Sequence, residues 1–284
     1  MYSLIVRNKY GDSMELTHND KFTISNISGF DPPDAEIHTV QYAGEDGSVY
    51  NSSTMNSRTI TITIAINNPA EENRLALYRY FKSKYPVRLY YRTETRNVYI
   101  DGYVQNFQVA YFNKKQTAQI TVYCPRPYLI EDIIPDDNII DMSNPLFEFP
   151  FSIEIGEPIP FSEPSELLLQ TITNHGDLET GCTITIHAMS TVVNPRFVNQ
   201  VNDQGIYLNT TLQPGDDLII CTIVGQKSIK RIRNTVETNL INAFSTGSVW
   251  MVIAAGENDI VVTADSGGAS MVLTFDVPAL YEGV

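Results

Sequence analysis

Four pairs of acidic residues are the groups in this sequence best suited to acid–base chemistry. They are Glu71 with Glu72, Asp136 with Asp137, Asp216 with Asp217, and Glu163 with Glu166. Glycosidases use two carboxylates about 5 to 10 Å apart. Each pair also has a structural explanation, because acids favour helix N-termini and turns, and the remaining pairs lie in a proline-rich stretch. A hydrolase is therefore the weakest function class that the sequence allows.

The histidines and cysteines show no spacing typical of a catalytic or metal site. They are His18, His38, His175 and His187, and Cys124, Cys182 and Cys221. No H-E-x-x-H, G-x-S-x-G or phosphate-loop motif accompanies them. An odd number of widely spaced cysteines fits buried or reduced thiols better than a disulfide framework or a zinc site. We therefore expect no catalytic residue, no metal site and no cofactor.

A short basic run is the exception to an acidic background. The chain has 19 Lys and Arg against 33 Asp and Glu, which gives a formal net charge of −14. The run consists of Lys227, Lys230, Arg231 and Arg233, in an expected strand. Two interpretations remain open: a solvated strand whose charges protect a sheet edge, or a docking strip for an acidic neighbouring protein.

Aromatic residues offer a second candidate binding feature. The chain contains 16 Tyr, 12 Phe and one Trp. Many of the tyrosines fall in the expected helix and strands of the first half, where core or subunit contacts explain them. Tyr207 and Trp250, near the expected loops of the second half, are the candidates for glycan contact by ring stacking.

The net charge also limits the partners that the chain can bind. Nucleic acid and anionic membranes would both repel an acidic protein. No run approaches the roughly 20 apolar residues that span a bilayer, and no early stretch has the pattern of a signal peptide. We expect a protein folded in a cytoplasm, without membrane insertion.

The first part of the chain is predicted to form strands around one helix. Residues 2–7 and 14–16 are expected to form a hairpin, followed by a glycine-punctuated loop over residues 29–57. Residues 58–66 alternate isoleucine with threonine, which is typical of a strand with one apolar face. Residues 87–124 are expected to form a three-stranded meander.

The single helix is predicted over residues 69–84. Asn68 is suited to cap it, Pro69 to its first position, and Glu71 to a capping box. Pro86 prevents further propagation. The packing face is expected to consist of Leu75, Leu77, Tyr78 and Phe81.

The last part of the chain is predicted to form a two-sheet β-sandwich. Eight short strands are separated there by turn signals, and no helical pattern interrupts them. Pro214 and Gly215 suit the two central positions of a type II turn. Residues 206–212 are therefore expected to pair with residues 218–224.

The length of 284 residues is enough for two cores. Residues 126–164 are rich in proline and show little periodicity, so we expect a linker there. The predicted organisation is an N-terminal domain over residues 1–125, the linker over 126–164, and a C-terminal sandwich over 165–284.

The order of these pieces resembles the distal tail protein family of long-tailed bacteriophages. The first half carries Gly44-Glu-Asp-Gly47 before the alternating strand, then the helix and the tyrosine-rich meander. The second half has the family's polar turns and Tyr-x-Gly ending at Asn174-His-Gly176, Asn194-Pro195, Pro214-Gly-Asp216, Gly256-Glu-Asn258 and Tyr281-Glu-Gly283. Together these motifs cover nearly the whole chain.

The resemblance implies a mainly β fold, with a β-sandwich or barrel-like N-terminal domain that carries one helix and a galectin-like C-terminal sandwich. It also implies a ring, usually of six copies, at the tail tip. Such a ring joins the tail tube to the hub and to the receptor-binding or baseplate proteins. The net charge predicts that DNA passes through the lumen of such a ring without specific binding. The alternative is an adhesin that binds glycans of the host surface directly.

Overall fold

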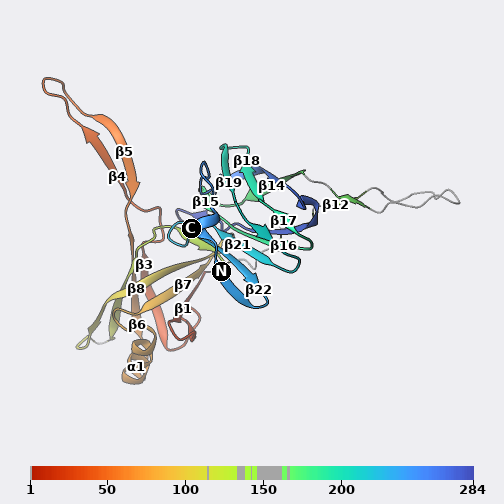
Figure 1. Cartoon of the computed structure of the whole chain (residues 1–284). Helices are drawn as coiled ribbons and strands as arrows, with labels where there is room; N and C mark the ends of the chain where they lie inside the picture. Colours follow the sequence, from red (N-terminus) through yellow and green to blue (C-terminus); the bar gives the residue numbers. More distant parts are fainter. Residues whose placement is uncertain (1, 114, 133–137, 142, 146–161, 165–166) are drawn as a thin grey trace, which may run out of the picture. The chain divides into compact units, whose positions relative to one another are not determined.

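The chain divides into two compact units. The computed structural model describes residues 2–113, 115–132, 138–141, 143–145, 162–164 and 167–284, with side chains up to residue 132, except 114, and from residue 169. The first unit is Met1–Ile133 with Leu280–Val284, and the second is Ile134–Ala279. In sequence, the second unit is thus an insertion into the first (Figure 1).

This division differs from the sequence-based one at two places. Strand β10 (Leu129–Glu131) pairs with β8 and with β27 (Leu280–Tyr281), so both short strands belong to the first unit. The sequence pattern places β10 in the predicted linker and β27 in the predicted second domain. Strands of two or three residues are too short for periodicity to reveal them. Most of the predicted linker lies outside the described residues.

The first unit is an antiparallel sheet with one helix and a separate hairpin. Its remaining elements are β1 (Ser3–Asn8), β2 (Ser13–Glu15), β3 (Phe22–Ser28), β4 (Ala35–Val40), β5 (Val49–Met55), β6 (Arg58–Ile66), α1 (Ala70–Tyr80), β7 (Pro86–Arg92), β8 (Asn97–Ala110) and β9 (Thr117–Cys124). The strand order is β2-β1-β7-β8-β9-β6-β3, and β10 extends it beside β8. The predicted opening hairpin (β1–β2) and meander (β7–β8–β9) are confirmed.

Alternation of apolar and polar residues explains the core of this sheet. Ile60, Ile62 and Ile64 of β6 are fully buried, whereas the threonines between them are exposed or half-buried. Strand β9, which pairs with β6, buries Ile120 and Val122 in the same way. Successive side chains of a strand point to opposite faces, so one face of the sheet forms the core. The prediction of a strand over residues 58–66 is confirmed.

The helix is shorter than predicted, and its predicted packing face is confirmed in part, because Leu77 and Phe81 are buried. It spans Ala70–Tyr80, and Pro69 is its N-cap without any side-chain hydrogen bond, so Asn68 is not the cap. Its buried residues are Asn73 and Leu77, whereas Leu75 is 52% exposed. Residues four apart share a helix face, so Leu75 cannot lie beside both buried positions. The predictions for Leu75 and for the helix ends were wrong.

The second unit is built from two larger antiparallel sheets. The first contains β11 (Asn138–Asp141), β26 (Met271–Asp276), β16 (Thr183–Ala188), β21 (Asp217–Cys221), β22 (Ser228–Arg233) and β23 (Val236–Asn239), in that order. The second contains β14 (Leu167–Asn174), β25 (Gly256–Thr263), β18 (Arg196–Asn199) and β19 (Gln204–Tyr207). Three two-stranded ladders accompany them: β12 (Ser143–Pro145) with β13 (Ser162–Pro164), β15 (Thr180–Gly181) with β24 (Val252–Ile253), and β17 (Val192–Val193) with β20 (Thr211–Leu212).

One apolar core joins the two larger sheets. Ile184, Ile220 and Leu273 of the first sheet and Phe197 and Val262 of the second are all fully buried and belong to a single cluster. Two antiparallel sheets that share one core form a β-sandwich. The sequence therefore predicted the architecture of this unit correctly.

The strand pairing around Pro214 and Gly215 was predicted wrongly. The turn itself is present, because Gly215 has φ 82° and the Asp216 amide donates to the Gln213 carbonyl at 3.0 Å. The flanking strands do not pair with each other: β20 pairs with β17, and β21 lies between β16 and β22. A turn motif reports a local reversal of the chain, but burial decides which strands become neighbours.

Candidate interaction surfaces

A two-stranded hairpin projects from the first unit and is exposed along its whole length. Strands β4 and β5 pair only with each other, and we call residues 35–55 the arm (Figure 1). Every residue of the arm is exposed except His38, which is half-buried. A two-stranded hairpin by itself is at most marginally stable in water. The exposed arm is therefore a candidate interaction surface.

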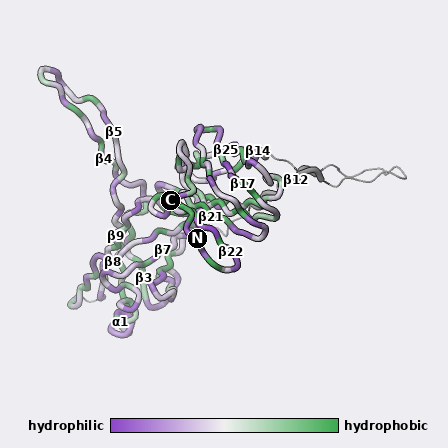
Figure 2. Tube along the Cα trace, viewed as in Figure 1, coloured by the Kyte–Doolittle hydropathy of each residue, from purple (hydrophilic) through white to green (hydrophobic). Residues whose placement is uncertain are grey.

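Apolar side chains on the arm are solvent-exposed. Ile37 is 63% exposed, Tyr42 57% and Tyr50 61%, and Val40, Val49 and Met55 are also exposed. Figure 2 shows both hydrophobic and hydrophilic stretches along the arm. Contiguous exposed apolar surface marks sites of protein–protein contact. Tyrosine is also among the residue types enriched at interfaces.

The arm is acidic as well as apolar. Between residues 30 and 57 the chain has five acids and no Lys or Arg: Asp31, Asp34, Glu36, Glu45 and Asp46. Glu45 and Asp46 form the tip, between Gly44 and Gly47, and both are exposed. A surface of one charge sign selects a partner surface of the opposite sign.

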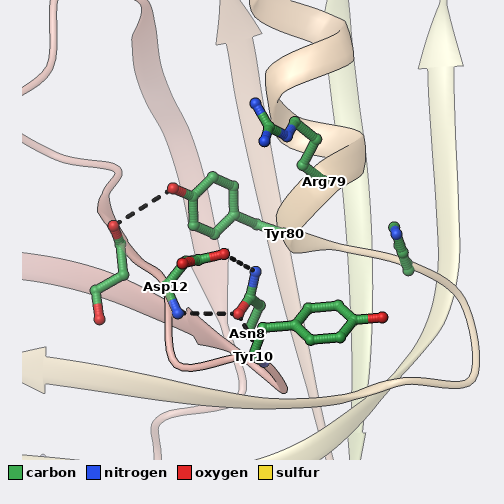
Figure 3. Close-up of a pocket in the computed structure, with 7 residues that line it drawn as sticks. Asn8, Tyr10, Asp12, Arg79 and Tyr80 are labelled. Atoms are coloured by element: carbon green, nitrogen blue, oxygen red, sulfur yellow. Dashed lines mark hydrogen bonds between the residues drawn. The ribbon is translucent and has the colours of Figure 1, made fainter.

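A basic depression lies elsewhere on the first unit, where the turn after β1 meets the end of α1. It has a volume of about 460 Å³ and is lined by Asn8, Tyr10, Asp12, Ser13, Arg79, Tyr80 and Lys82. In Figure 3, Arg79 and Tyr80 come from α1, whereas Asn8, Tyr10 and Asp12 come from the turn. We call this site the basic depression.

Hydrogen bonds from Asn8 hold the turn in place. Its Oδ1 accepts from the amides of Tyr10 at 2.9 Å and Asp12 at 3.0 Å, and its Nδ2 donates to the Asp12 carboxylate at 3.2 Å (Figure 3). The Tyr80 hydroxyl donates to the Ser13 carbonyl at 3.5 Å. These bonds join the turn to α1, so the depression is preformed.

The lining of the depression includes Arg79, Lys82 and two tyrosines, and Lys9 lies beside it. The Lys9 Nζ lies 4.4 Å from the centroid of the Tyr85 ring and 5.5 Å from that of Tyr10, and the Lys82 Nζ lies 5.8 Å from that of Tyr10. Arg79 adds a third positive charge in the last helical turn. Asp12 is the one acid that lines the depression. The site is therefore suited to bind an acidic partner.

The basic run of the second unit lies on β22, where several of its charges are already in use. The Lys230 Nζ is 2.8 Å from the Glu237 carboxylate, and the Lys227 Nζ lies 5.7 Å from the Trp250 ring. Arg233 donates to both carboxylate oxygens of Asp216. The Nε of Arg231 is buried without a partner among the described residues. Docking of an acidic protein at Lys227, Lys230, Arg231 and Arg233 stays a prediction.

The Arg233–Asp216 pair stabilises the second unit. Asp216 is 1% exposed, and its pKa is held below the ordinary value, mainly by the hydrogen bonds from Arg233. A depressed pKa contributes stability that is present above the unfolded pKa near 4 and is lost as the pH falls through the folded pKa. Asp216→Asn should lower the melting temperature by about 3 to 6 °C at pH 7. Below pH 4 the original chain begins to lose the stability that the ionised Asp216 provides, whereas the variant has no carboxyl to protonate. The difference between the two melting temperatures should therefore shrink below pH 4. Scanning calorimetry at pH 7 and pH 3.5 checks this.

The two candidates for glycan contact are both half-buried. Trp250 stacks on Phe244 with ring centroids 4.7 Å apart and packs against the sandwich core. The amide of Tyr207 donates to the Ser248 hydroxyl at 3.0 Å, within the sandwich. Glycan stacking at Tyr207 and Trp250 stays a prediction.

The acids singled out in the sequence take part in structural contacts. Asp216 pairs with Arg233, and its neighbour Asp217 lies 2.6 Å from His187 Nδ1 across β16 and β21. Within the described part of the chain, no three His, Cys, Asp or Glu residues are grouped to hold a metal ion. None of the helices described there is long and apolar enough to cross a membrane.

Comparison with known proteins identifies the family. Residues 9–124 match the phage tail protein RIFT-related domain, and residues 175–277 match the C-terminal domain of the siphovirus-type tail component. Each match falls within one of the two units. The chain belongs to the siphophage distal tail protein family. It is a structural component of the phage tail and its baseplate hub.

Solved structures of distal tail and baseplate proteins have the same fold. The Dit protein (gp 19.1) of phage SPP1 matches with a TM-score of 0.68 at 12% identity, over 97% of this chain and 98% of that one. Chains of the phage P2 baseplate in its activated conformation, with Ca and with Sr, match over 100% of both chains. Their TM-scores are 0.56 and 0.57, at 15% and 16% identity. No curated protein sequence matches significantly. The predicted mainly β, two-domain fold class is confirmed.

Proposed function

We propose that this distal tail protein assembles into a closed ring, of six copies by family resemblance, at the tip of a phage tail. The projecting arm carries this proposal, because its apolar side chains are exposed in a single copy. Burying them between copies provides the favourable term that self-association requires. The matched structures include baseplates, which supports a ring that joins the tail tube to hub, receptor-binding and other baseplate proteins.

A ring requires contacts between two different surfaces of the same chain. Head-to-tail contacts of this kind close into a ring when the rotation between copies permits it. An arm that leaves the unit on one side and meets a neighbour on another supplies such a contact. The role is therefore structural and needs neither a catalytic group nor a cofactor.

The charge of the chain fits passage of DNA through the ring. Each copy carries a formal net charge of −14, so an assembled ring repels the phosphate backbone. Genomic DNA then passes through without adhering to the lumen. The N-terminal domain, residues 1–125 with the added strands β10 and β27, closes the ring, and the galectin-like C-terminal sandwich offers a docking surface for other tail proteins.

The oligomeric state of the purified chain tests this proposal. Native mass spectrometry should give the mass of six chains, and negative-stain images should show rings with a central hole. A monomer at micromolar concentration that binds cell-wall glycans in a pull-down would overturn the proposal and favour the adhesin.

A further inference from the structure

We propose that the acidic tip of the arm docks into the basic depression of a second copy of this chain. The inference rests on the proposed ring and names the surface that receives the arm. Glu45 and Asp46 at the tip are exposed, Arg79 and Lys82 line the depression, and Lys9 lies beside it, next to Tyr10. The two surfaces are thus opposite in charge and belong to the same chain.

The structure shows no carboxylate paired with the cations of the depression in the part of the chain that it describes. Within the described residues, no ion pair engages Lys9, Arg79 or Lys82. Elsewhere in the first unit, Arg88 and Arg92 are paired with Asp101 and Asp132. A depression whose cations form no ion pair among the described residues gains from an acidic occupant.

Both surfaces also carry exposed tyrosine side chains. Tyr42 and Tyr50 of the arm are 57% and 61% exposed, and Tyr10 beside the depression is 64% exposed. Tyr85 is 38% exposed and lies under Lys9. Tyrosine supplies large contact area and a polar hydroxyl, and it is enriched at the centres of interfaces. Docking would bury these rings together with the charged tip.

The arm of one copy is placed to reach another copy rather than its own depression. Strand β5 ends just before β6, whereas α1 follows the other end of β6, about 30 Å away for a strand of nine residues. In Figure 1 the arm extends away from the part of the first unit where α1 lies. The contact is therefore head to tail, which is the geometry that a ring needs.

Charge reversal and its rescue provide the test. The double variant Glu45→Lys/Asp46→Lys and the double variant Lys9→Glu/Lys82→Glu should each raise the concentration at which the ring dissociates by about tenfold or more. A chain that carries all four changes should regain assembly to within about threefold of the original. Analytical ultracentrifugation measures the dissociation, and circular dichroism checks that each variant is folded.

A matched control uses two exposed charges outside both surfaces. Lys21→Glu/Glu257→Lys should leave assembly unchanged, because neither residue lies on the arm or the depression. If the original chain forms rings but reversal at Lys9 and Lys82 has no effect, the inference is overturned while the proposed function stands. If the four-fold variant fails to recover while both double variants are folded, the arm binds another surface or another tail protein. If the original chain is a monomer, both proposals fail.

Cross-linking gives a second, independent readout. Chains with Asp46→Cys are mixed with chains with Lys82→Cys and oxidised, and a disulfide-linked pair should form only in the mixture. Both chains also carry Cys221→Ser, because Cys221 is a half-buried free thiol. Cys124 and Cys182 should not compete, because burial raises the pKa of each thiol to about 12. Equal amounts of linked pairs in the unmixed samples would contradict docking at this site.

Discussion

Replacing the arm by a tight turn is expected to convert the ring into monomers without unfolding the first unit. Ala35 and Met55 are cross-strand partners, so an Asn-Gly turn can replace residues 36–54 between them. The arm residues are exposed and contribute nothing to the core of the sheet. The armless variant therefore loses contacts between copies and none within the core of the sheet, so assembly should be undetectable at micromolar concentration.

Light scattering coupled to size-exclusion chromatography measures this result, and thermal unfolding checks the fold. The melting temperature should change by less than about 2 °C, because changes on the exposed surface have small effects on stability. Val201→Ser/Val236→Ser is the matched control, since it removes exposed apolar side chains from the second unit and should leave the ring intact. An armless chain that still forms rings would show that other surfaces of the first unit hold the copies together.

The arm is also the element that the sequence described least well. Residues 29–57 were expected to form a glycine-punctuated loop, yet residues 35–40 and 49–55 are paired strands. Strand prediction relies on alternation between a buried and an exposed face. Both faces of the arm are exposed, so its sequence carries no such alternation. By contrast, β6 buries one face and was predicted to the residue.

The basic depression could not be predicted for a different reason. Lys9 and Lys82 are far apart in the sequence, and neither belongs to a motif. They come together because β1 pairs with β7 in a register that places Asn8 opposite Val87, just after the helix ends. Long-range register depends on burial across the whole sheet rather than on local signals. The basic run on β22, which is local, was visible in the sequence at once.

The contacts of residues 280–284 could not be predicted from the sequence either, because they too join residues that are far apart in the chain. These contacts also predict a large loss of stability when one of them is removed. The Tyr-x-Gly motif was noted in the sequence, but its contacts lie with residues early in the chain. Arg58 donates through Nη1 to the Gly29 carbonyl at 3.1 Å and through Nη2 to the Glu282 carbonyl. Gly29 precedes the arm and Arg58 follows it, so this one side chain joins both ends of the arm to the returning segment.

Arg58→Met is therefore expected to destabilise the first unit by about 1–3 kcal/mol. The side chain is 4% exposed, and an apolar residue of similar length leaves two carbonyls without their donor. Burial lowers the pKa of the Arg58 guanidinium, because keeping a buried charge costs free energy. Arg58→Met removes this cost, which offsets part of the free energy lost with the hydrogen bonds. Denaturant unfolding of the first unit measures the change.

Hydrogen exchange shows which residues Arg58→Met destabilises, and a second arginine variant shows whether the change is specific to Arg58. The amides of residues 280–284 should exchange faster in Arg58→Met, since the Arg58 hydrogen bond to the Glu282 carbonyl is one of the contacts, together with those from β10, Arg96 and Phe30, that hold this segment. Arg92→Met is the control: Arg92 is half-exposed, its ion pair with Asp132 spans 3.7 Å, and its loss should cost less than about 1 kcal/mol. Because Arg58 fixes the base of the arm, the ring should also dissociate more readily in Arg58→Met than in Arg92→Met. Equal stability, exchange and assembly in the two variants would show that the base of the arm is held without Arg58.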